Sequence, residues 1–503
     1  MGNNMNNVAN RHNVKLDLIL RTSVFSSPTL TTSAQISSVR MVVVLIPGQS
    51  ISHLTPMMEF ADVCLRRGLA VTVVVPDPTL TAPAFRSAIY RYASRLPSLA
   101  VHSLPPPPAH PHSLGAVHPF IRMQAAFRSQ APGLRDFLRS LPAVHALVAD
   151  MFAVDALDVA AEVGVPGHLF YCTGANNLAV FLQLPSFCSR SGGDLKDLGD
   201  APVSFPGVRT MPASHLVDGV LDSGTELYAA VLDVLGRMSA ARGILVNSFE
   251  ALEGSVMAAI REGRCLPEHA NPSVYCVGPL IAEGEKEEER HPCLPWLDAQ
   301  PERSVVFICF GSRCTLSLEQ ITEMAKGLEK SGHRFLWVLR APPAFAAAAG
   351  EPDAALSLLP EGFLARTADK GLVVTASWVP QVDVLRHAST GAFLTHCGWN
   401  STLEAVATGM PMVCWPLEAE QWMNKVYIVE EMKVGIEVRG YKPGELATAD
   451  NVDATVRSIM DMESEGRRTV MERALAVKES AAAAWKEGGS SFAAFTEFVK
   501  QME

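Results

Sequence analysis

The sequence predicts an α/β protein built from two doubly wound, Rossmann-like domains that face a cleft. Short apolar, β-branched runs alternate with helical patterns, and this series occurs twice, before about residue 250 and after about residue 300. Uninterrupted apolar strands between helices are typical of parallel sheets that helices cover on both faces. Ligands of such sheets bind beyond the carboxyl ends of the strands, so we expect the functional residues there.

The first series contains four apolar runs that we expect to be strands. They are MVVVLIP (41–47), AVTVVVP (70–76), HALVAD (145–150) and HLFY (168–171). A helical pattern that ends in RRG (66–68) follows the first run, and ALDVAAEVG (156–164) follows the third.

The second series has the same alternation. Its expected strands are SVVFICF (304–310), RFLWVLR (334–340), GLVVTA (371–376), GAFLTH (391–396) and PMVCWP (411–416). The stretch LEQITEMAKGLEKSG (318–332) between the first two is helical in pattern, and the charged EGEKEEERHP (283–292) between the two series has the composition of a linker.

The composition excludes several classes of protein. A net charge of −10 argues against a nucleic-acid partner, which needs clustered Lys and Arg. The ten cysteines form no C-x-x-C pair, which favours reduced thiols and a cytoplasmic location. No apolar run approaches the roughly 18 residues that a membrane span needs. Residues 1–40, rich in Asn, Ser and Thr, are expected to be a disordered extension or a transit segment, which leaves plastid targeting open.

The stretch GAFLTHCGWNS (391–401) places several chemically active side chains at the end of an expected strand. With STLEAVAT as the following helix, HCGWN is the strand-to-helix turn, and its unpaired N–H groups and the helix dipole favour an anion such as phosphate. No Lys or Arg occurs in residues 387–424, so dipoles and neutral donors would hold that anion. The alternatives are a metal site, for which His396 and Cys397 lack spaced partners, and a Cys397 nucleophile without a base motif beside it.

Residues 378–421, WVPQVDVLRHASTGAFLTHCGWNSTLEAVATGMPMVCWPLEAEQ, resemble the 44-position signature box of plant family-1 UDP-sugar glycosyltransferases. The resemblance extends through VNSFEALE (246–253), CLPWLDAQPERSVVFICFGS (293–312) and EKSGHRFLWVLR (329–340). It is greatest to the subgroup acting on flavonoids, chalcones and related phenols. It implies a GT-B fold and an inverting transfer that needs no metal and no cofactor besides the UDP-sugar donor.

The resemblance also implies the domain organisation. We expect an acceptor-binding domain at 41–280, a linker at 281–300 and a UDP-sugar-binding domain at 301–483. A C-terminal helix at 484–503 would pack back on the first domain, and the protein would act as a monomer.

Donor-binding roles follow from the same resemblance. Trp378 matches the residue that stacks on uracil, with Val379 and Gln381 beside it; the alternative is a core tryptophan before a proline turn. Glu404 matches the carboxylate that holds the ribose diol. The alternative is a capping box, Ser401-x-x-Glu404, which would occupy both side chains locally.

The diphosphate and the sugar have their own sets of matching residues. The diphosphate ligands implied by the resemblance are His396, Asn400, Ser401 and, in the other loop, Ser312. The residues around the sugar hydroxyls are Trp399, Glu420 and Gln421. In the family a final Gln in the box goes with glucose, so the resemblance implies UDP-glucose as the donor.

The catalytic pair implied by the resemblance is His53 with Asp150. His53, in PGQSISHLTP (47–56), would sit near the N-terminus of a helix that Pro56 starts, where the dipole keeps the imidazole neutral. Asp150 ends the run HALVAD and would orient the imidazole and stabilise the imidazolium. Both residues follow parallel strands, so one sheet edge can present both; a helix-capping histidine is the alternative.

The expected reaction is a single displacement in which His53 takes the proton of an acceptor hydroxyl and UDP leaves toward the helix N-terminus. Inversion of α-linked UDP-glucose gives a β-glucoside. The competing hypotheses are a non-catalytic UDP-sugar-binding protein and the same enzyme with another UDP-sugar donor.

The sequence departs from the family pattern at a few positions. Ser52 stands where Gly often precedes the base, Arg313 and Cys314 follow CFGS, and Glu418 stands where an aromatic residue or His is common. We expect Arg313 either to lie near the diphosphate or to be an ordinary exposed side chain. Candidate acceptor or sugar contacts are Thr173, Phe152 and Glu418. Tyr171, Phe181 and Leu184 fit a greasy acceptor pocket and core packing equally well.

Overall fold

The computed structural model of the protein describes residues 40–107, 117–266, 272–282, 290–342, 345, 352–375 and 379–503. The chain folds into two compact units. The first contains the described residues up to Cys172, with Arg237–Leu245 and Thr496–Glu503, and the second contains Thr173–Gly236 and Val246–Phe495. The expected linker, 281–300, lies partly outside the described residues, so the boundaries drawn from the sequence stay a prediction.

The first sheet has seven strands in the order β3-β2-β1-β4-β5-β8-β9. The strands are β1 (Val42–Ile46), β2 (Ala70–Val75), β3 (Ala100–Ser103), β4 (Ala146–Asp150), β5 (Gly167–Tyr171), β8 (Gly243–Val246) and β9 (Ser273–Cys276). The four expected strands are confirmed, and neighbouring strands from β3 to β5 pair in parallel. The chain runs outward from β1 to β3 and then returns to the other side of β1. The topological switch point therefore lies between β1 and β4, where such sheets bind ligands.

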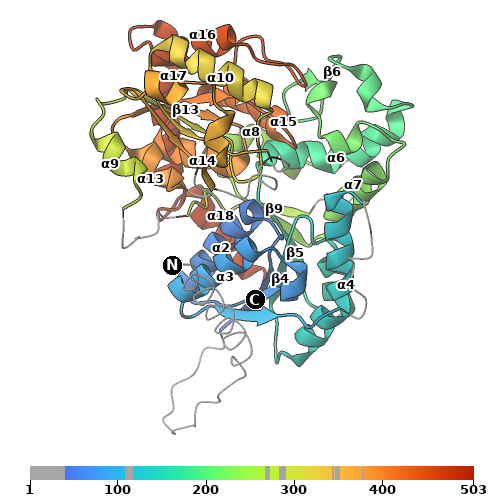
Figure 1. Ribbon diagram of the computed structural model, residues 1–503. Coiled ribbons are helices and arrows are strands. Elements are labelled where there is room, and N and C mark those ends of the chain that lie inside the picture. The colour runs from blue at the N-terminus through green and yellow to red at the C-terminus, as the bar shows by residue number, and fades with distance from the viewer. Residues whose placement is uncertain are drawn as a thin grey trace. The chain divides into compact units, whose positions relative to one another are not determined.

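Helices cover this part of the first sheet on both sides. They are α2 (Ile51–Arg66), α3 (Pro83–Arg95), α4 (Pro119–Ser140) and α5 (Asp155–Glu162). In Figure 1, α2 and α3 lie on one side of β4 and α4 lies on the other. The expectation that Pro56 starts the first helix is wrong. Ser50 caps α2 through its side chain, which makes Ile51 the first residue and leaves Pro56 inside the helix.

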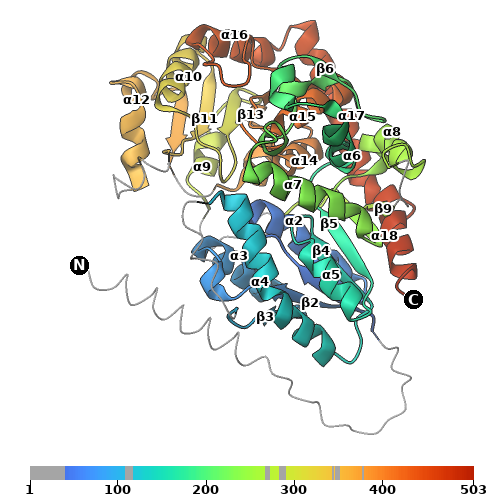
Figure 2. The ribbon, with the colours of Figure 1, turned by 90° about the vertical axis from the view of Figure 1, so that its right-hand side faces the viewer.

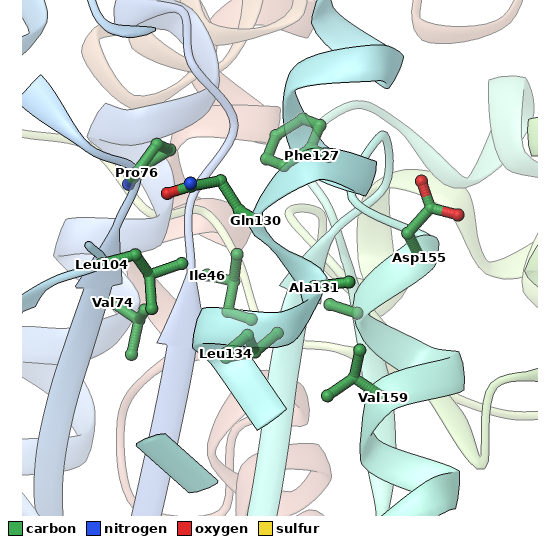
Figure 3. Close-up of a pocket in the computed structure, with 11 residues that line it drawn as sticks. Ile46, Val74, Pro76, Leu104, Phe127, Gln130, Ala131, Leu134, Asp155 and Val159 are labelled. Carbon is green, nitrogen blue, oxygen red and sulfur yellow. The ribbon is translucent and has the colours of Figure 1, made fainter. Parts of the chain in front are cut away.

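A small pocket lies in the first unit between the sheet and helices α4 and α5 (Figure 3). Its volume, about 20 Å³, has room for about one water molecule. Ile46, Phe127, Leu134 and Val159 give it an almost wholly apolar lining. We interpret it as a gap in the packing.

The second sheet has six strands in the order β12-β11-β10-β13-β14-β15. The strands are β10 (Val305–Cys309), β11 (Arg334–Val338), β12 (Gly371–Val374), β13 (Thr390–Thr395), β14 (Met412–Cys414) and β15 (Gly435–Glu437). Every pair is parallel, and the five expected strands are confirmed. The chain again runs outward from the first strand and returns to its other side. The switch point here lies between β10 and β13.

Helices of the second unit pack on both faces of this sheet (Figure 2). The helices of this unit are α6 (Ala175–Ser191), α8 (Glu250–Arg261), α9 (Cys293–Asp298), α10 (Leu318–Ser331), α12 (Phe363–Arg366), α13 (Gln381–Arg386), α14 (Trp399–Thr408), α15 (Gln421–Val426), α16 (Ala449–Met460) and α17 (Glu465–Ala484). Two more helices, α7 (Glu226–Arg237) and α18 (Ser490–Lys500), have residues in both units.

Strand β10 shows why this apolar run forms a doubly covered strand. Phe307 points into a core with Leu403 of α14 and Val477 of α17, whereas Ile308 points into a second core with Met324 of α10 and Val456 of α16. Because successive side chains of a strand point to opposite faces, only an uninterrupted apolar run fills both cores.

No helix in the described ranges is long and apolar enough to cross a membrane.

Candidate active site

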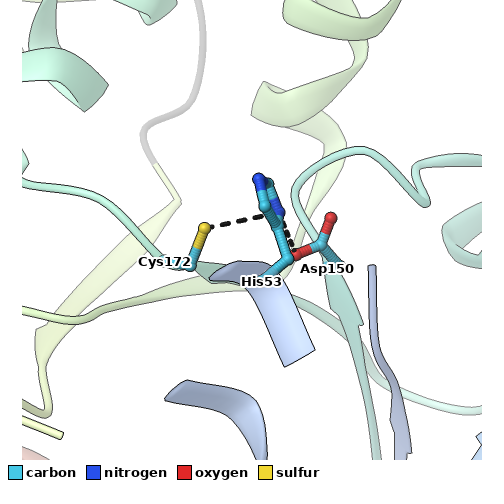
Figure 4. A group of neighbouring side chains, drawn as sticks. All are labelled: His53, Asp150 and Cys172. Atoms are coloured by element: carbon cyan, nitrogen blue, oxygen red, sulfur yellow. Dashed lines mark hydrogen bonds and ion pairs between the residues drawn. The ribbon is translucent and has the colours of Figure 1, made fainter. Parts of the chain in front are cut away.

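The candidate site of the first unit is a histidine–carboxylate pair at the switch point of the first sheet (Figure 4). His53 is the third residue of α2, which follows β1, and Asp150 is the last residue of β4. His53 Nδ1 lies 2.8 Å from Asp150 Oδ2, with the Asp150 side chain fully buried and the His53 side chain 17% exposed. The sequence therefore placed both members of the pair at the correct sheet edge. Because Asp150 engages Nδ1, Nε2 is the nitrogen left to accept a proton.

Two backbone features fix the position of this pair. The backbone N–H of Phe152 donates to Asp150 Oδ1 over 3.0 Å, which orients the carboxylate. A Cβ atom at Gly48 would lie 2.8 Å from both the Asp150 carboxyl carbon and the His53 Cβ. Only glycine lets the chain after β1 pass so close to both side chains. Sequence reasoning missed Gly48, although its place directly after a strand and Pro47 was a signal.

The charge around His53 favours its protonated form. Burial lowers the pKa of His53, but the nearby Asp150 carboxylate and Cys172 sulfur outweigh burial and hold the pKa well above its ordinary value of 6.5. This differs from the expectation that the helix dipole keeps the imidazole neutral. A full negative charge at hydrogen-bond distance acts more strongly than the partial charge of a helix end. The pair is thus well suited to stabilise the imidazolium that forms when a base takes a proton.

Aromatic side chains lie beside the pair. Phe152, one of the expected acceptor contacts, stacks on the His53 ring at 4.9 Å between ring centroids, and Phe120 of α4 meets Phe152 edge to face at 5.3 Å. Gln124 Nε2 donates to the Phe152 carbonyl oxygen at 3.0 Å. An apolar, flat surface therefore adjoins the candidate base. Phe120 could not be found from the sequence, because nothing in a helical pattern says which turn faces a neighbouring strand end.

The candidate site of the second unit is the turn between β13 and α14. The helix begins at Trp399, two residues earlier than we expected, and its N-cap, Gly398, provides no side-chain hydrogen bond. Cys397 has a positive φ of 66° and is fully buried, and its carbonyl oxygen accepts a hydrogen bond from Asn424 Nδ2 at 2.8 Å. Burial holds the pKa of the Cys397 thiol well above its ordinary value, which contradicts a nucleophile at this position. Asn424, which supports the turn, was missed by sequence reasoning.

His396 joins this turn to the loop that follows β10. The residue is 9% exposed, and Cβ atoms built on Gly311 and Gly398 would lie 2.6 and 2.4 Å from its Nε2. The expected diphosphate ligand Ser312 follows Gly311 and is exposed. Burial lowers the pKa of His396 to about 4, so the imidazole is neutral at physiological pH. The structure thus brings the two expected phosphate loops together around a neutral histidine.

Glu404, the carboxylate expected to bind the ribose, hydrogen-bonds to Gln381 and does not form the capping box that its spacing from Ser401 suggested. Because Gly398 is the N-cap of α14, Ser401 lies inside the helix, and the capping-box alternative for Ser401 and Glu404 is wrong. Gln381 Nε2 instead donates to Glu404 Oε2 at 2.6 Å and to Ser401 Oγ at 3.0 Å. Burial raises the pKa of Glu404 to about 7. Three residues expected to bind the donor therefore form one polar cluster.

The residues expected around the sugar are held by hydrogen bonds within the second unit. Trp399 is 3% exposed, and its Nε1 donates to the Asn247 carbonyl oxygen at 2.7 Å. Gln421 is 5% exposed, and its Oε1 accepts from the backbone N–H groups of Leu417 and Glu418. Glu420 precedes α15 and is partly exposed. Their contact with a sugar stays a prediction.

Two further residues expected to contact the donor, Asn400 and Val379, also belong to the second unit. Asn400 is the second residue of α14, and Val379 is 6% exposed. Trp378 lies outside the described residues.

Two departures from the family pattern meet in the structure. Arg313 Nη2 lies 3.4 Å from Glu418 Oε1; the Arg313 side chain is 70% exposed and the Glu418 side chain 43%. Gln421 Nε2 donates a hydrogen bond to the Sγ atom of Cys314, the next residue, at 3.4 Å. The expected acceptor contact Thr173 is 5% exposed and accepts from Asn177 Nδ2.

Core packing is the better interpretation of the three apolar residues that also fitted an acceptor pocket. Tyr171 and Leu184 are fully buried and Phe181 is 6% exposed.

Comparison with known proteins agrees with this geometry. Residues 248–470 match the family described as UDP-glucoronosyl and UDP-glucosyl transferase. The chain is 37% identical over 475 residues to an anthocyanidin 5,3-O-glucosyltransferase of a Rosa hybrid cultivar, covering 91% of this chain and 98% of that protein. It is 42% identical over 395 residues to a phloretin 2'-O-glucosyltransferase of Pyrus communis, covering 75% and 81%.

Solved structures give the same result. Phytolacca americana UGT2, complexed with UDP-2fluoro-glucose and pterostilbene, superposes with a TM-score of 0.81 at 33% identity over 92% of this chain and 99% of that chain. A Polygonum tinctorium UDP-glucosyltransferase capable of glucosylating indoxyl gives 0.81 at 37% identity, covering 92% and 98%. The fold and the relatives define a glycosyltransferase with the GT-B fold. The chain belongs to the plant family-1 UDP-glycosyltransferases, as the signature box predicted.

Proposed function

We propose that this enzyme transfers glucose from UDP-glucose to a hydroxyl group of a small phenolic acceptor and releases a β-glucoside and UDP. The observation that carries the proposal is the His53–Asp150 pair at 2.8 Å, with an apolar aromatic wall beside it. The names of relatives support the acceptor class, because they include glucosyltransferases of anthocyanidin and of phloretin and a complex with pterostilbene.

His53 is the general base in this proposal. Nε2 accepts the proton of the acceptor hydroxyl as its oxygen attacks the anomeric carbon, and Asp150 keeps Nδ1 protonated and stabilises the imidazolium. Phe152 and Phe120 bind the flat face of the phenol and keep water away from the reacting oxygen. One displacement on the anomeric carbon inverts its configuration.

The donor is held by residues of the second unit. Glu404, relieved of Gln381, accepts hydrogen bonds from the ribose hydroxyls, while Val379 contacts the uracil and Trp378 takes the stacking role that the family resemblance implies. Neutral donors, among them His396, bind the diphosphate together with the backbone N–H groups at the start of α14. These groups stabilise the negative charge that grows on UDP as it leaves, so the reaction needs no metal. Trp399, Glu420 and Gln421 select glucose.

A competition assay tests the proposal. The enzyme is given equal amounts of UDP-glucose, UDP-galactose and UDP-glucuronate with anthocyanidin, phloretin, pterostilbene and an aliphatic alcohol, and products are identified by mass. We expect phenol glucosides, with the β configuration shown by the anomeric coupling constant in the proton NMR spectrum. Preference for another donor would contradict the roles given to Trp399 and Gln421, and an α-linked product would contradict the single displacement.

A further inference from the structure

The candidate base belongs to a cluster of three side chains that can each donate an electron pair to a metal (Figure 4). Cys172, the residue after β5, places its Sγ 3.4 Å from His53 Nδ1, and Asp150 Oδ2 lies 2.8 Å from the same nitrogen. The three atoms all lie within 4.8 Å of one another. Among the described residues, this is the one group of three such side chains so close together.

Two distances within the cluster can be compared with those of a tetrahedral zinc site. Bond lengths of about 2.3 Å for Zn–S and about 2.0 Å for Zn–N and Zn–O place nitrogen about 3.5 Å from sulfur and about 3.3 Å from oxygen. The observed Nδ1–Sγ distance of 3.4 Å already fits. The Nδ1–Oδ2 distance of 2.8 Å has to widen by about half an ångström. The His53 side chain, which is 17% exposed, is the member of the cluster with room to make that shift.

The chemistry of the cluster selects a particular kind of cation. An imidazole nitrogen, a thiolate and a carboxylate suit a zinc-type ion, whereas Mg²⁺ and Ca²⁺ prefer oxygen ligands alone. Three protein ligands leave a fourth position for water.

We propose that His53 Nδ1, Asp150 Oδ2 and Cys172 Sγ form a binding site for a thiophilic divalent cation of the zinc type, and that the bound cation inhibits the transferase. The cation replaces the proton on Nδ1 and the proton on Sγ, and both protons are released to solvent. With a dipositive ion on Nδ1, Nε2 is a much poorer proton acceptor, and Asp150 no longer stabilises an imidazolium. Binding is independent of the function proposed above, whereas inhibition rests on the role of His53 as the base.

Cobalt binding tests the site without reference to activity. Co²⁺ is added to the metal-free full-length enzyme, and the absorption spectrum is followed for a thiolate-to-cobalt charge-transfer band. The variants are Cys172→Ser, which removes the soft ligand, and the control Cys188→Ser, which changes another buried cysteine that is also 6% exposed. We expect the band in the wild type and in Cys188→Ser, its loss in Cys172→Ser, and its displacement by Zn²⁺. A wild type without the band, or a Cys172→Ser variant that keeps it, would overturn the site.

Zinc inhibition tests the second half of the proposal. Each variant is assayed with rising Zn²⁺ relative to its own metal-free rate. We expect Cys172→Ser to need at least about tenfold more Zn²⁺ for half inhibition than the wild type, with Cys188→Ser unchanged. Equal inhibition of all three proteins would overturn the inhibitory role. If the wild type glucosylated no phenol, the proposed function would fail, but the cobalt spectrum would still decide whether the site exists.

Discussion

One histidine lies at the switch point of each sheet, and the pKa of the first is raised whereas the pKa of the second is lowered. His53 follows β1 at the switch point of the first sheet, and His396 follows β13 at the switch point of the second. Asp150 lies 2.8 Å from His53 and raises its pKa, whereas His396 packs against Gly311 and Gly398 and burial lowers its pKa to about 4. The sheet topology therefore determines the position of each histidine, whereas the neighbouring side chains and burial determine its pKa.

The difference matches the two tasks proposed for the two histidines. A base must take up a proton during the reaction, so a neighbouring carboxylate helps it. A ligand for a departing diphosphate has to donate a hydrogen bond, and a neutral imidazole does so through its N–H. Since residues 387–424 contain no Lys or Arg, the donor binding proposed for the turn between β13 and α14 relies on backbone N–H groups and neutral side chains.

Replacing each histidine by alanine gives the largest expected effect and separates the two roles. We expect His53→Ala to lower kcat about 10²-fold to 10⁴-fold and to leave UDP affinity unchanged, because it removes only the base. His396→Ala should weaken UDP binding. Steady-state kinetics and calorimetric titration with UDP measure both effects. If His53→Ala instead lost UDP affinity and kept its kcat, the division of roles would be wrong.

Asp150→Asn removes the carboxylate beside His53, so that His53, like His396, becomes a buried imidazole without a carboxylate partner. We expect a loss in kcat of about tenfold to hundredfold, because the amide does not stabilise an imidazolium. The pH dependence of the rate should also change in a defined direction. In the wild type the rate falls as pH drops below the raised pKa of His53, and without the carboxylate burial lowers that pKa, so the acid limb moves to lower pH. An acid limb that stays in place would mean that Asp150 does not set the protonation of His53.

Gly398→Ala tests the close packing that keeps His396 neutral. The new Cβ would lie 2.4 Å from His396 Nε2, so the ring or the turn has to move. We expect the KM for UDP-glucose to rise about tenfold, equivalent to about 1.4 kcal/mol, while kcat changes less. The control is Gly466→Ala in α17, where a Cβ meets no atom within 4 Å. An unchanged KM would show that the turn does not bind the donor.

Glu404 gives the smallest expected effect, and it depends on pH. With a pKa of about 7, its carboxyl group is neutral at lower pH and becomes the carboxylate that accepts from the ribose hydroxyls as pH rises. We expect the KM for UDP-glucose to fall by up to about tenfold between about pH 6 and about pH 8. In Glu404→Gln this change should disappear. A KM that follows the same pH dependence in the variant would assign the dependence to another group.

The strands could be predicted from the sequence because they depend on local patterns, whereas the choice of His53 and Asp150 as the candidate pair came from the family resemblance. An apolar run bounded by helices identifies a buried parallel strand, and a polar residue at its carboxyl end identifies the ligand edge. Asp150 at the end of β4 follows from that rule.

Contacts between distant segments could not be predicted in the same way. The pairing of Gln381 with Glu404, the support of Cys397 by Asn424 and the approach of Cys172 to His53 depend on how loops fold against each other. The upward pKa shift of His53 was missed for the same reason, since it depends on a 2.8 Å distance that no spacing in the sequence gives.

The roles proposed for the two histidines depend on one difference: His53 is poised to hold a proton, whereas His396 is kept neutral. An NMR titration of the ¹⁵N-labelled imidazoles of the free enzyme tests it most directly. His53→Ala and His396→Ala identify the two resonances among the 14 histidines. We predict that His53 becomes protonated at a pH above 6.5 and that His396 stays neutral until the pH approaches about 4. If His396 took up its proton at a higher pH than His53, the roles proposed for the two histidines would be wrong.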